Sequence, residues 1–329
     1  MTWECAIKNI DDFFSISEET NKSITFMGGE PFLAFTLIKK IVDYIKVTYP
    51  CEWVDYTIVT NGTLVHNEIQ DWIKQHESNV QVVLSLDDLG ESHNANRSNS
   101  LKRIDLVFFR SLSKPIINTV FTPQTIDNLA NTIIDLHEYN FYIKGFIADG
   151  ERWKDKHVYL LGEQLQLLID YYQKHPQVPP FSLLSMPLYY LTMDKAISRC
   201  GTEKNEEVSV STDGKLWACH RCTPFENHGT WKIPDKYINL INASHLLPEC
   251  NDCFLEKICN ACPASNAAMK DDPELSNVTC SIRKLLFKAN AYFATTMLLS
   301  ENNYIALQHL SNEKKKNLAA SAKIILENL

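Results

Sequence analysis

Short apolar runs alternate with amphipathic stretches from residue 23 to about residue 172. Several of the runs are rich in Val, Ile, Phe and Tyr and are apolar on both faces, as the strands of a buried parallel sheet are. We expect strands at residues 24–27, 56–60, 80–86, 115–121 and 141–147.

Between these runs, apolar residues recur at a spacing of three or four, which indicates helices that bury one face. These positions are Leu37, Ile41 and Ile45, then Ile69, Trp72 and Ile73, then Ile126, Leu129, Ile133 and Leu136. Thr122 is the expected N-cap of the third helix, with Pro123 at its first position. The repeated alternation implies right-handed βαβ units, and therefore an α/β fold with an open sheet or a barrel.

The pattern changes after residue 174. Residues 175–187 hold four of the thirteen prolines, which is typical of a linker. Val208 and Val210 then alternate with polar residues, Asp213-Gly214 is a hairpin-turn dipeptide, and an apolar run returns. A cysteine-rich region follows, and a helical pattern runs from about Ser281 to the end.

Composition narrows the function classes. Among the 329 residues, 45% are hydrophobic and 22% are charged, which are ordinary values for a globular protein. A net charge of −8 argues against a surface for nucleic acid or for an anionic membrane. The first fifteen residues lack the apolar core of a secretory leader, and no apolar stretch of about 18 residues occurs. We therefore expect a cytoplasmic protein.

Ten cysteines need an explanation in a reducing compartment, where clustered thiols more often bind metal than form disulfides. Cys5 and Cys51 stand alone, as buried or incidental thiols do. The candidate metal ligands are Cys200, Cys219, Cys222, Cys250, Cys253, Cys259, Cys262 and Cys280.

Two kinds of metal site compete for these eight thiols. Zinc ribbons place roughly 12 to 20 residues between their two C-x-x-C pairs, whereas Cys253 and Cys259 are separated by only five residues. Iron–sulfur clusters take four thiolates each, so eight thiols suit two clusters. The spacing favours iron–sulfur, and zinc stays the alternative.

A second candidate site follows the first expected strand, where the chain reads Gly28-Gly29-Glu30-Pro31. Paired glycines let a ligand approach the backbone closely, and a carboxylate beside them can pair with an ammonium group. A tight turn would explain these four residues equally well.

Three segments of the first half resemble motifs of the radical S-adenosylmethionine (radical SAM) enzymes. The segments are ITFMGGEPFL at 24–33, TNGT at 60–63 and SLDDLGESHNANR at 85–97. In the third segment, Ser85, Asp87, His93 and Arg97 match the family pattern SLDG-x4-HD-x-x-R, while Asp88 replaces its glycine. His93 and Arg97 are read equally well as a structural hydrogen-bonded pair.

The cysteine-rich half resembles the SPASM (twitch-type) auxiliary-cluster domain that follows the barrel in many of these enzymes. Cys200, Gly214 and Cys219 follow its Cys…Gly-x4-Cys pattern, and ACHRC resembles its PCHRF. The second half matches up to Cys259, and the gap to Cys262 is one residue short.

The resemblance implies an incomplete (β/α)6 partial barrel, a small SPASM iron–sulfur domain and a helical tail. The corresponding ranges are residues 1–174 for the barrel, 175–198 for a linker, 199–285 for the SPASM domain and 286–329 for the tail.

The resemblance also implies cofactors. S-adenosylmethionine (SAM) would lie near Gly28, Gly29, Glu30, Pro31, Asn61, Ser85, Asp87 and Asn118. One auxiliary 4Fe-4S cluster would take Cys250, Cys253, Cys259 and Cys280. A second would take Cys200, Cys219 and Cys262, with Cys222 or an open site in the fourth position. No catalytic residue is assigned. His220, beside Cys219, is read either as a proton acceptor or as a structural histidine.

The family's C-x3-C-x2-C motif, which binds the SAM-cleaving cluster, lies upstream of the Gly-Gly-Glu-Pro strand. Only 27 residues precede Gly28 here, and Cys5 is their single cysteine. We therefore expect the first barrel strand and its cluster loop to lie before Met1, and these residues alone not to cleave SAM.

The functional reading is a peptide- or protein-modifying maturase. The alternatives are a non-catalytic iron–sulfur subunit that binds a peptide or a partner, and a fragment of a longer enzyme. We expect a peptide or protein substrate, no nucleic acid and no membrane. A partner strand or subunit is expected at the open edge formed by residues 24–27.

Overall fold

The computed structural model describes residues 1–16, 21–194, 207–217, 219–222, 250, 252–259, 261–269 and 272–329. They fall into two compact units. The first comprises Met1–Val120, Asn131–Phe146 and Thr212–Gly214, and the second comprises Phe121–Ala130, Ile147–Ser211 and Lys215–Leu329.

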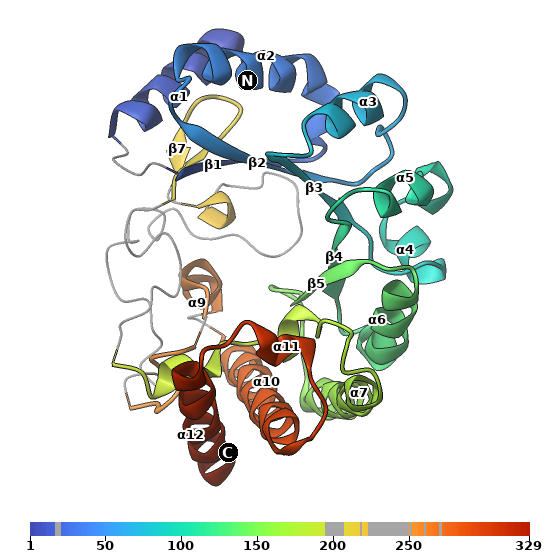
Figure 1. The fold of residues 1–329 in the computed structure, drawn as a ribbon, viewed down its shortest axis with the longest axis vertical. Coiled ribbons are helices and arrows are strands. Elements are labelled where there is room, and N and C mark those ends of the chain that lie inside the picture. Colours follow the sequence, from blue (N-terminus) through green and yellow to red (C-terminus); the bar gives the residue numbers. More distant parts are fainter. Residues whose placement is uncertain are drawn as a thin grey trace. The chain divides into compact units, whose positions relative to one another are not determined.

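A five-stranded sheet forms the framework of the fold (Figure 1). Its strands are β1 (Asn21–Phe26), β2 (Trp53–Thr60), β3 (Val80–Ser85), β4 (Ile116–Phe121) and β5 (Tyr142–Ile147), in the order β1-β2-β3-β4-β5. The pairs β1/β2, β2/β3 and β3/β4 are parallel. All the expected strands are confirmed. Because spatial order follows chain order, with no reversal in the described sheet, the topology is that of a barrel segment rather than a doubly wound sheet.

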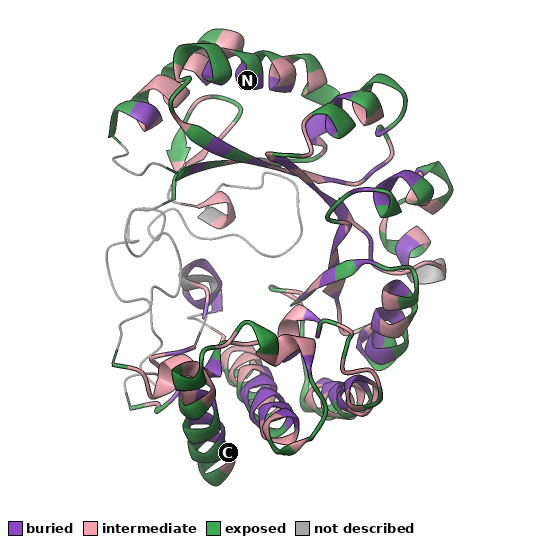
Figure 2. Ribbon diagram, viewed as in Figure 1, coloured by how far each residue is buried: buried purple, intermediate pink, exposed green. Residues whose placement is uncertain are grey.

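Helices precede, connect and follow these strands. They are α1 (Trp3–Ile16), α2 (Phe35–Thr48), α3 (Glu68–Gln75), α4 (Glu91–Asn96), α5 (Leu106–Arg110), α6 (Leu129–Glu138) and α7 (Asp155–Lys174), with 3-10 turns η1 (Pro31–Ala34), η2 (Leu101–Arg103) and η3 (Ile126–Asn128). The predicted apolar stripes face the core, since Ile45, Ile73 and Ile133 are almost fully buried. Buried positions also recur along β2, β3 and β4 (Figure 2).

One predicted helix start is wrong. Thr122 was the expected N-cap, but the helical segment begins at Ile126. The Thr122 N–H donates to the Thr125 hydroxyl at 3.0 Å, and the Ile126 N–H donates back to the Thr122 carbonyl at 3.1 Å. These local bonds close a turn around Pro123, so the helix starts after it.

The described residues after α7 form short 3-10 turns, a hairpin and a set of helices. β6 (Ser209–Val210) pairs antiparallel with β7 (Leu216–Trp217), as the Asp213-Gly214 turn predicted, and Gly214 has φ +83°. The other elements are η4 (Ser182–Leu184), η5 (Leu188–Leu191), η7 (His220–Cys222), α9 (Pro263–Met269), α10 (Pro273–Leu299), α11 (Ile305–Gln308) and α12 (Asn312–Asn328). The helical tail is confirmed. Its first helix starts earlier than expected, at Pro273, because the Asp272 side chain caps the Leu275 N–H at 3.0 Å.

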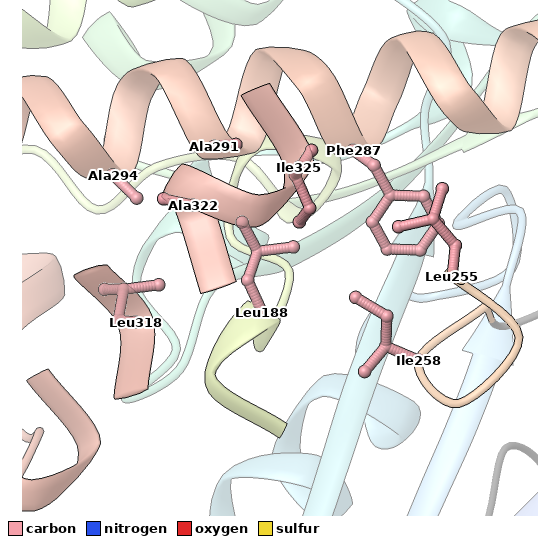
Figure 3. Close-up of a cluster of buried hydrophobic side chains, with 9 residues drawn as sticks. All are labelled: Leu188, Leu255, Ile258, Phe287, Ala291, Ala294, Leu318, Ala322 and Ile325. Carbon is pink, nitrogen blue, oxygen red and sulfur yellow. The ribbon is translucent and has the colours of Figure 1, made fainter. Parts of the chain in front are cut away.

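A hydrophobic cluster holds this half together (Figure 3). Its members are Leu188, Leu255, Ile258, Phe287, Ala291, Ala294, Leu318, Ala322 and Ile325. They come from η5, from the segment between Cys253 and Cys259, and from α10 and α12. Leu188, which lies within the predicted linker, is therefore part of this core. The predicted domain boundaries stay predictions. Within the described ranges, no helix has the length and apolarity that crossing a bilayer requires.

The cluster predicts a contrast between two adjacent isoleucines of α12. Ile325 is fully buried and Ile324 is 37% exposed. We expect Ile325→Ala to lower the free energy of unfolding by about 2–5 kcal/mol because it leaves a cavity. The control Ile324→Ala should change it by no more than about 0.5 kcal/mol. Urea unfolding followed by circular dichroism measures both, and equal losses would contradict the packing of α12.

Candidate functional site

The loop after β1 presents open backbone. Gly28 has φ +147°, a conformation that side chains with a β-carbon rarely adopt. A β-carbon built at Gly28 or at Gly29 would meet no atom within 4 Å. Both glycines are exposed. A ligand can therefore approach this backbone closely, as the sequence predicted.

The Glu30 carboxylate fastens two strand ends together. One oxygen accepts from the Thr60 hydroxyl at 2.8 Å and from the Phe32 N–H at 3.1 Å, while the other accepts from the Asn61 N–H at 2.8 Å. Pro31 starts η1 directly after it. Because both oxygens accept hydrogen bonds, Glu30 positions the loops after β1 and β2, and its pairing with an ammonium group stays a prediction.

The loop after β2 is rigid for two local reasons. The Asn61 side-chain oxygen accepts from the Thr63 N–H at 2.9 Å and from the Thr63 hydroxyl at 2.8 Å. At Gly62, which has φ +79°, a β-carbon would lie 2.6 Å from the Leu84 side chain, so only glycine fits. The half-buried Asn61 is thus held at the carboxyl end of β2.

Ser85 and Asn118 are direct neighbours in the register of β3 and β4. The Asn118 side-chain oxygen is buried and has no hydrogen-bond partner among the described residues. Leaving a buried acceptor unpaired costs about 1–3 kcal/mol, so such a group calls for a donor from a ligand or water. The carboxyl end of β3 and the facing position in the middle of β4 therefore present an acceptor without a partner among the described residues, where the resemblance predicted the cofactor.

Asp87 is buried and engaged. The Asp87 carboxylate accepts two hydrogen bonds from Arg97, of 2.8 Å from Nε and 2.7 Å from Nη2. Its carbonyl accepts from the Thr119 hydroxyl at 3.0 Å. Arg97 thus has the structural role that the sequence left open, and a cofactor role for Asp87 stays a prediction.

His93 belongs to the same network. Its Nδ1 accepts from the Asp87 N–H at 3.3 Å, so the ring proton lies on Nε2, 2.9 Å from the Ser100 hydroxyl. Burial, and then the Arg97 cation, lower the pKa of His93 from its ordinary value of 6.5. The imidazole is therefore neutral near pH 7, with both nitrogens occupied by structural bonds.

The segment from Cys253 to Cys259, called the cysteine loop, is held in place by two buried apolar side chains within it. Leu255 and Ile258, between Cys253 and Cys259, insert into the hydrophobic cluster beside Phe287 (Figure 3). Backbone bonds close the loop, with Cys253 N–H to the Cys250 carbonyl at 3.1 Å and Cys259 N–H to the Leu255 carbonyl at 2.8 Å. The half-buried thiols are thus fixed by packing.

The Cys259 thiol reports its surroundings through its pKa. Burial raises the pKa, while the Arg283 cation and the Ala261 N–H lower it. The thiols of Cys250 and Cys253 raise it further, because thiolates repel one another. The structure therefore brings these three predicted ligands together with a cation and an amide donor beside them.

Cys280 lies on α10, and Cys262 directly precedes α9. Cys280 and Arg283 are three residues apart on α10 and so share a helix face. Arg283 donates to the Asn266 side chain of α9 at 3.1 Å. Cys262 directly precedes α9, and its carbonyl accepts the Asn266 N–H at 2.9 Å.

The hairpin supplies a further set of donors. The Cys219 sulfur lies 3.6 Å from His220 Nδ1, which lies 4.0 Å from a Glu207 carboxylate oxygen. These three groups could together hold a metal ion. Cys200 and the side chain of Cys222 lie outside the described residues. Sequence reasoning missed Glu207, because a lone carboxylate in a polar segment carries no motif.

The donor chemistry fits a thiolate-bound cluster. Cys250 and Cys253 lie close enough to Cys259 to raise its pKa, the Arg283 cation and the Ala261 N–H lower that pKa, and Cys280 lies on the helix that carries Arg283. Iron–sulfur clusters take four thiolates and are stabilised by such hydrogen bonds.

Comparisons with known proteins find similarity to iron–sulfur and radical SAM proteins. Residues 4–104 match the family of 4Fe-4S single cluster domains. The radical SAM cyclopropyl synthase TigE of Paramaledivibacter caminithermalis is 31% identical over 159 residues, which are 45% of this chain and 33% of that protein. An uncharacterized protein of Methanocaldococcus jannaschii is 40% identical over 82 residues, or 25% of this chain and 28% of that one.

Solved structures share the fold. The anSMEcpe enzyme with bound AdoMet superimposes with a TM-score of 0.68 at 18% identity, covering 91% of this chain and 90% of that chain. Streptococcus suis SuiB bound to S-adenosylmethionine gives a TM-score of 0.51 at 17% identity, with 78% and 64% covered.

The predicted resemblance and fold class are thereby confirmed. The chain spans about a third of the length of the curated relatives it matches. The 4Fe-4S match covers residues that contain only Cys5 and Cys51, so this stretch does not by itself supply four thiolates.

The His93 network predicts a pH dependence of stability. Because the folded-state pKa of His93 lies below 6.5, the unfolded chain takes up the proton first as the pH falls. This contribution to stability is complete above about pH 6.5 and is lost below it.

We expect the urea midpoint of the wild type to drop between about pH 7.5 and about pH 5.5, and to drop less in His93→Gln. The measurement is urea unfolding at both values. His137, whose burial lowers its pKa to about 4, contributes the same background to both proteins. An identical drop in the two would show that His93 is not held neutral.

Proposed function

We propose that this chain, which has the radical SAM fold, is the SAM- and cluster-binding portion of a peptide- or protein-modifying maturase. The observation that carries the proposal is the grouping of Cys250, Cys253 and Cys259 beside Arg283. That arrangement suits an anionic thiolate cluster. A second candidate site lies on the sheet, at Gly28, Gly29 and Asn118.

SAM would lie at the strand ends of the sheet. Gly28 and Gly29 leave their backbone open, and the unpaired Asn118 oxygen can accept from a donor group of the cofactor. Ser85 is its neighbour in register. Glu30 and Asp87 would act indirectly by holding the loops. SAM supplies an electrophilic sulfonium when bound, and these residues would orient it.

Two 4Fe-4S clusters would lie in the cysteine-rich half. Cys250, Cys253, Cys259 and Cys280 would hold one, and Cys200, Cys219 and Cys262 the other, with Cys222 or an open site in the fourth position. Such clusters supply one-electron chemistry or a coordination position for substrate. The protein contributes half-burial, the Ala261 N–H and the Arg283 cation at the sulfurs.

A peptide or protein is the proposed substrate class. Two structures that share this fold are anSMEcpe with bound peptides, with TM-scores of 0.61 and 0.57. TigE, the relative in sequence, is a cyclopropyl synthase. We place the reaction in the cytoplasm, where thiolate clusters persist.

A partner strand or subunit would pair with β1, which is the edge strand of the sheet among the described residues. The buried Lys22 points inward there, pairs with Glu52 at 2.8 Å and lies over the Phe14 ring of α1. An inward charge limits indiscriminate edge pairing, so we expect a selective partner rather than general aggregation.

The thiol assignment is tested by iron content. After anaerobic reconstitution we expect about eight iron atoms per chain, because each cluster holds four. Cys253→Ser should reduce this to about four. Cys51→Ser, which removes an exposed and isolated thiol, should leave it unchanged. Stoichiometric zinc with no brown chromophore would refute the assignment.

The cofactor site is tested by SAM titration calorimetry. Asn118→Leu keeps the side-chain volume and removes the unpaired oxygen, so we expect the Kd for SAM to rise about tenfold, which is about 1.4 kcal/mol. The control Asn302→Leu changes an exposed asparagine remote in sequence. A wild type that does not bind SAM would contradict the proposal for this site.

A further inference from the structure

Arg221 contacts three separate segments of the chain. Its backbone N–H donates to the Cys219 sulfur at 3.5 Å. Its guanidinium donates to the Asp149 carboxylate and, at 3.3 Å, to the Ser265 hydroxyl. One residue therefore contacts a predicted cluster ligand, the loop after β5 and helix α9.

The Asp149 partner is fixed to the sheet. The preceding Ala148 N–H donates to the Phe121 carbonyl of β4 at 2.8 Å, and the Ala148 carbonyl accepts from the Trp153 ring at 2.8 Å. Gly150, with φ +78°, turns the chain immediately afterwards. Asp149 is thus a firm anchor for a cation.

The Ser265 partner is fixed to the second cysteine segment. Ser265 is fully buried and lies on α9, three residues after Cys262. The carbonyl of Cys262 accepts from Asn266 of the same helix at 2.9 Å. A bond to Ser265 therefore positions Arg221 relative to the end of α9 that carries Cys262.

We propose that Arg221 is the positioning residue of the second cluster: it sets Cys219, which follows the hairpin, against Cys262, which precedes α9, and its charge, offset by Asp149, tunes the cluster's reduction potential. This inference rests on the proposed function, which assigns both cysteines to one cluster. The two cysteines come from segments far apart in the chain, and holding them together before metal binds removes an entropic cost from assembly.

The chemistry of the guanidinium suits this role. Its planar fork offers several donors in fixed directions, so one side chain can reach a carboxylate and a hydroxyl at once. A lysine at this position would supply the charge as a single point. The side chains of Arg221 and Asp149 are 34% and 27% exposed, so water screens the pair only in part.

The charges predict opposite effects on the potential. A cation near an anionic cluster favours the reduced, more negative form and so raises the midpoint potential. Removing the Arg221 charge should lower that potential, and removing the Asp149 charge should raise it. The N–H bond to the Cys219 sulfur comes from the backbone, so neither substitution deletes it.

Four variants of the reconstituted full chain separate position from charge. Arg221→Ala removes the side-chain hydrogen bonds to Asp149 and Ser265. We expect iron to fall from about eight to about four atoms per chain, with the other cluster's EPR signal retained. Arg221→Lys should keep more iron than Arg221→Ala and a potential near the wild type. Arg221→Gln should lower the midpoint potential of the second cluster, and Asp149→Asn should raise it, in EPR-monitored redox titrations.

Arg152→Gln is the matched control, since it removes an exposed positive charge from the same loop. It should leave iron content and potential unchanged. A wild type with only about four iron atoms would overturn the proposed second cluster itself. A wild type with about eight, together with unchanged iron in Arg221→Ala, would overturn the positioning role alone. Shifts of the same sign in Arg221→Gln and Asp149→Asn would overturn the electrostatic role.

Discussion

The parallel pairing of β1 to β4 is the constraint on which the polar site depends. In-register parallel strands end along the same edge, so the loops after β1 and β2 and the neighbours Ser85 and Asn118 gather at one place. The Glu30 carboxylate then fastens the first two loops with bonds of 2.8 Å. Without that register the same residues would be scattered polar groups.

The polar site contains two kinds of residue: those whose hydrogen bonds hold the loops in place, and those whose polar groups are open to a ligand. Glu30 hydrogen-bonds to Thr60 and to the Asn61 backbone, and Asp87 hydrogen-bonds to Arg97. His93 hydrogen-bonds to the Asp87 backbone and to Ser100. The open backbone of Gly28 and Gly29 and the unpaired oxygen of Asn118 are left for a ligand. A charged residue in a family motif can therefore serve the site by its rigidity rather than by contact.

The thiol site depends on a different kind of support, which is apolar packing. Leu255 and Ile258 lie inside the cysteine loop and insert among the residues of α10 and α12, so burial of ordinary side chains sets the positions of Cys253 and Cys259 (Figure 3). The Arg283 cation and the Ala261 N–H then make the sulfurs' surroundings suitable for thiolate. The C-terminal helices, which carry no recognisable chemistry except Cys280, thus support the thiol site.

By itself, the sequence determined the α/β class, all the strands of the sheet, the hairpin and the cysteine candidates, because hydrophobic period, turn dipeptides and thiol spacing are local signals. Local signals failed at Thr122, where a closed turn replaced the expected cap. Only the tertiary structure decided that Glu30 and Asp87 are engaged, that the Asn118 oxygen has no partner among the described residues, that Glu207 lies near Cys219, and that Arg221 contacts Asp149 and Ser265. These are properties of partners distant in the chain, and the partner of a side chain is chosen by packing rather than by its neighbours in sequence.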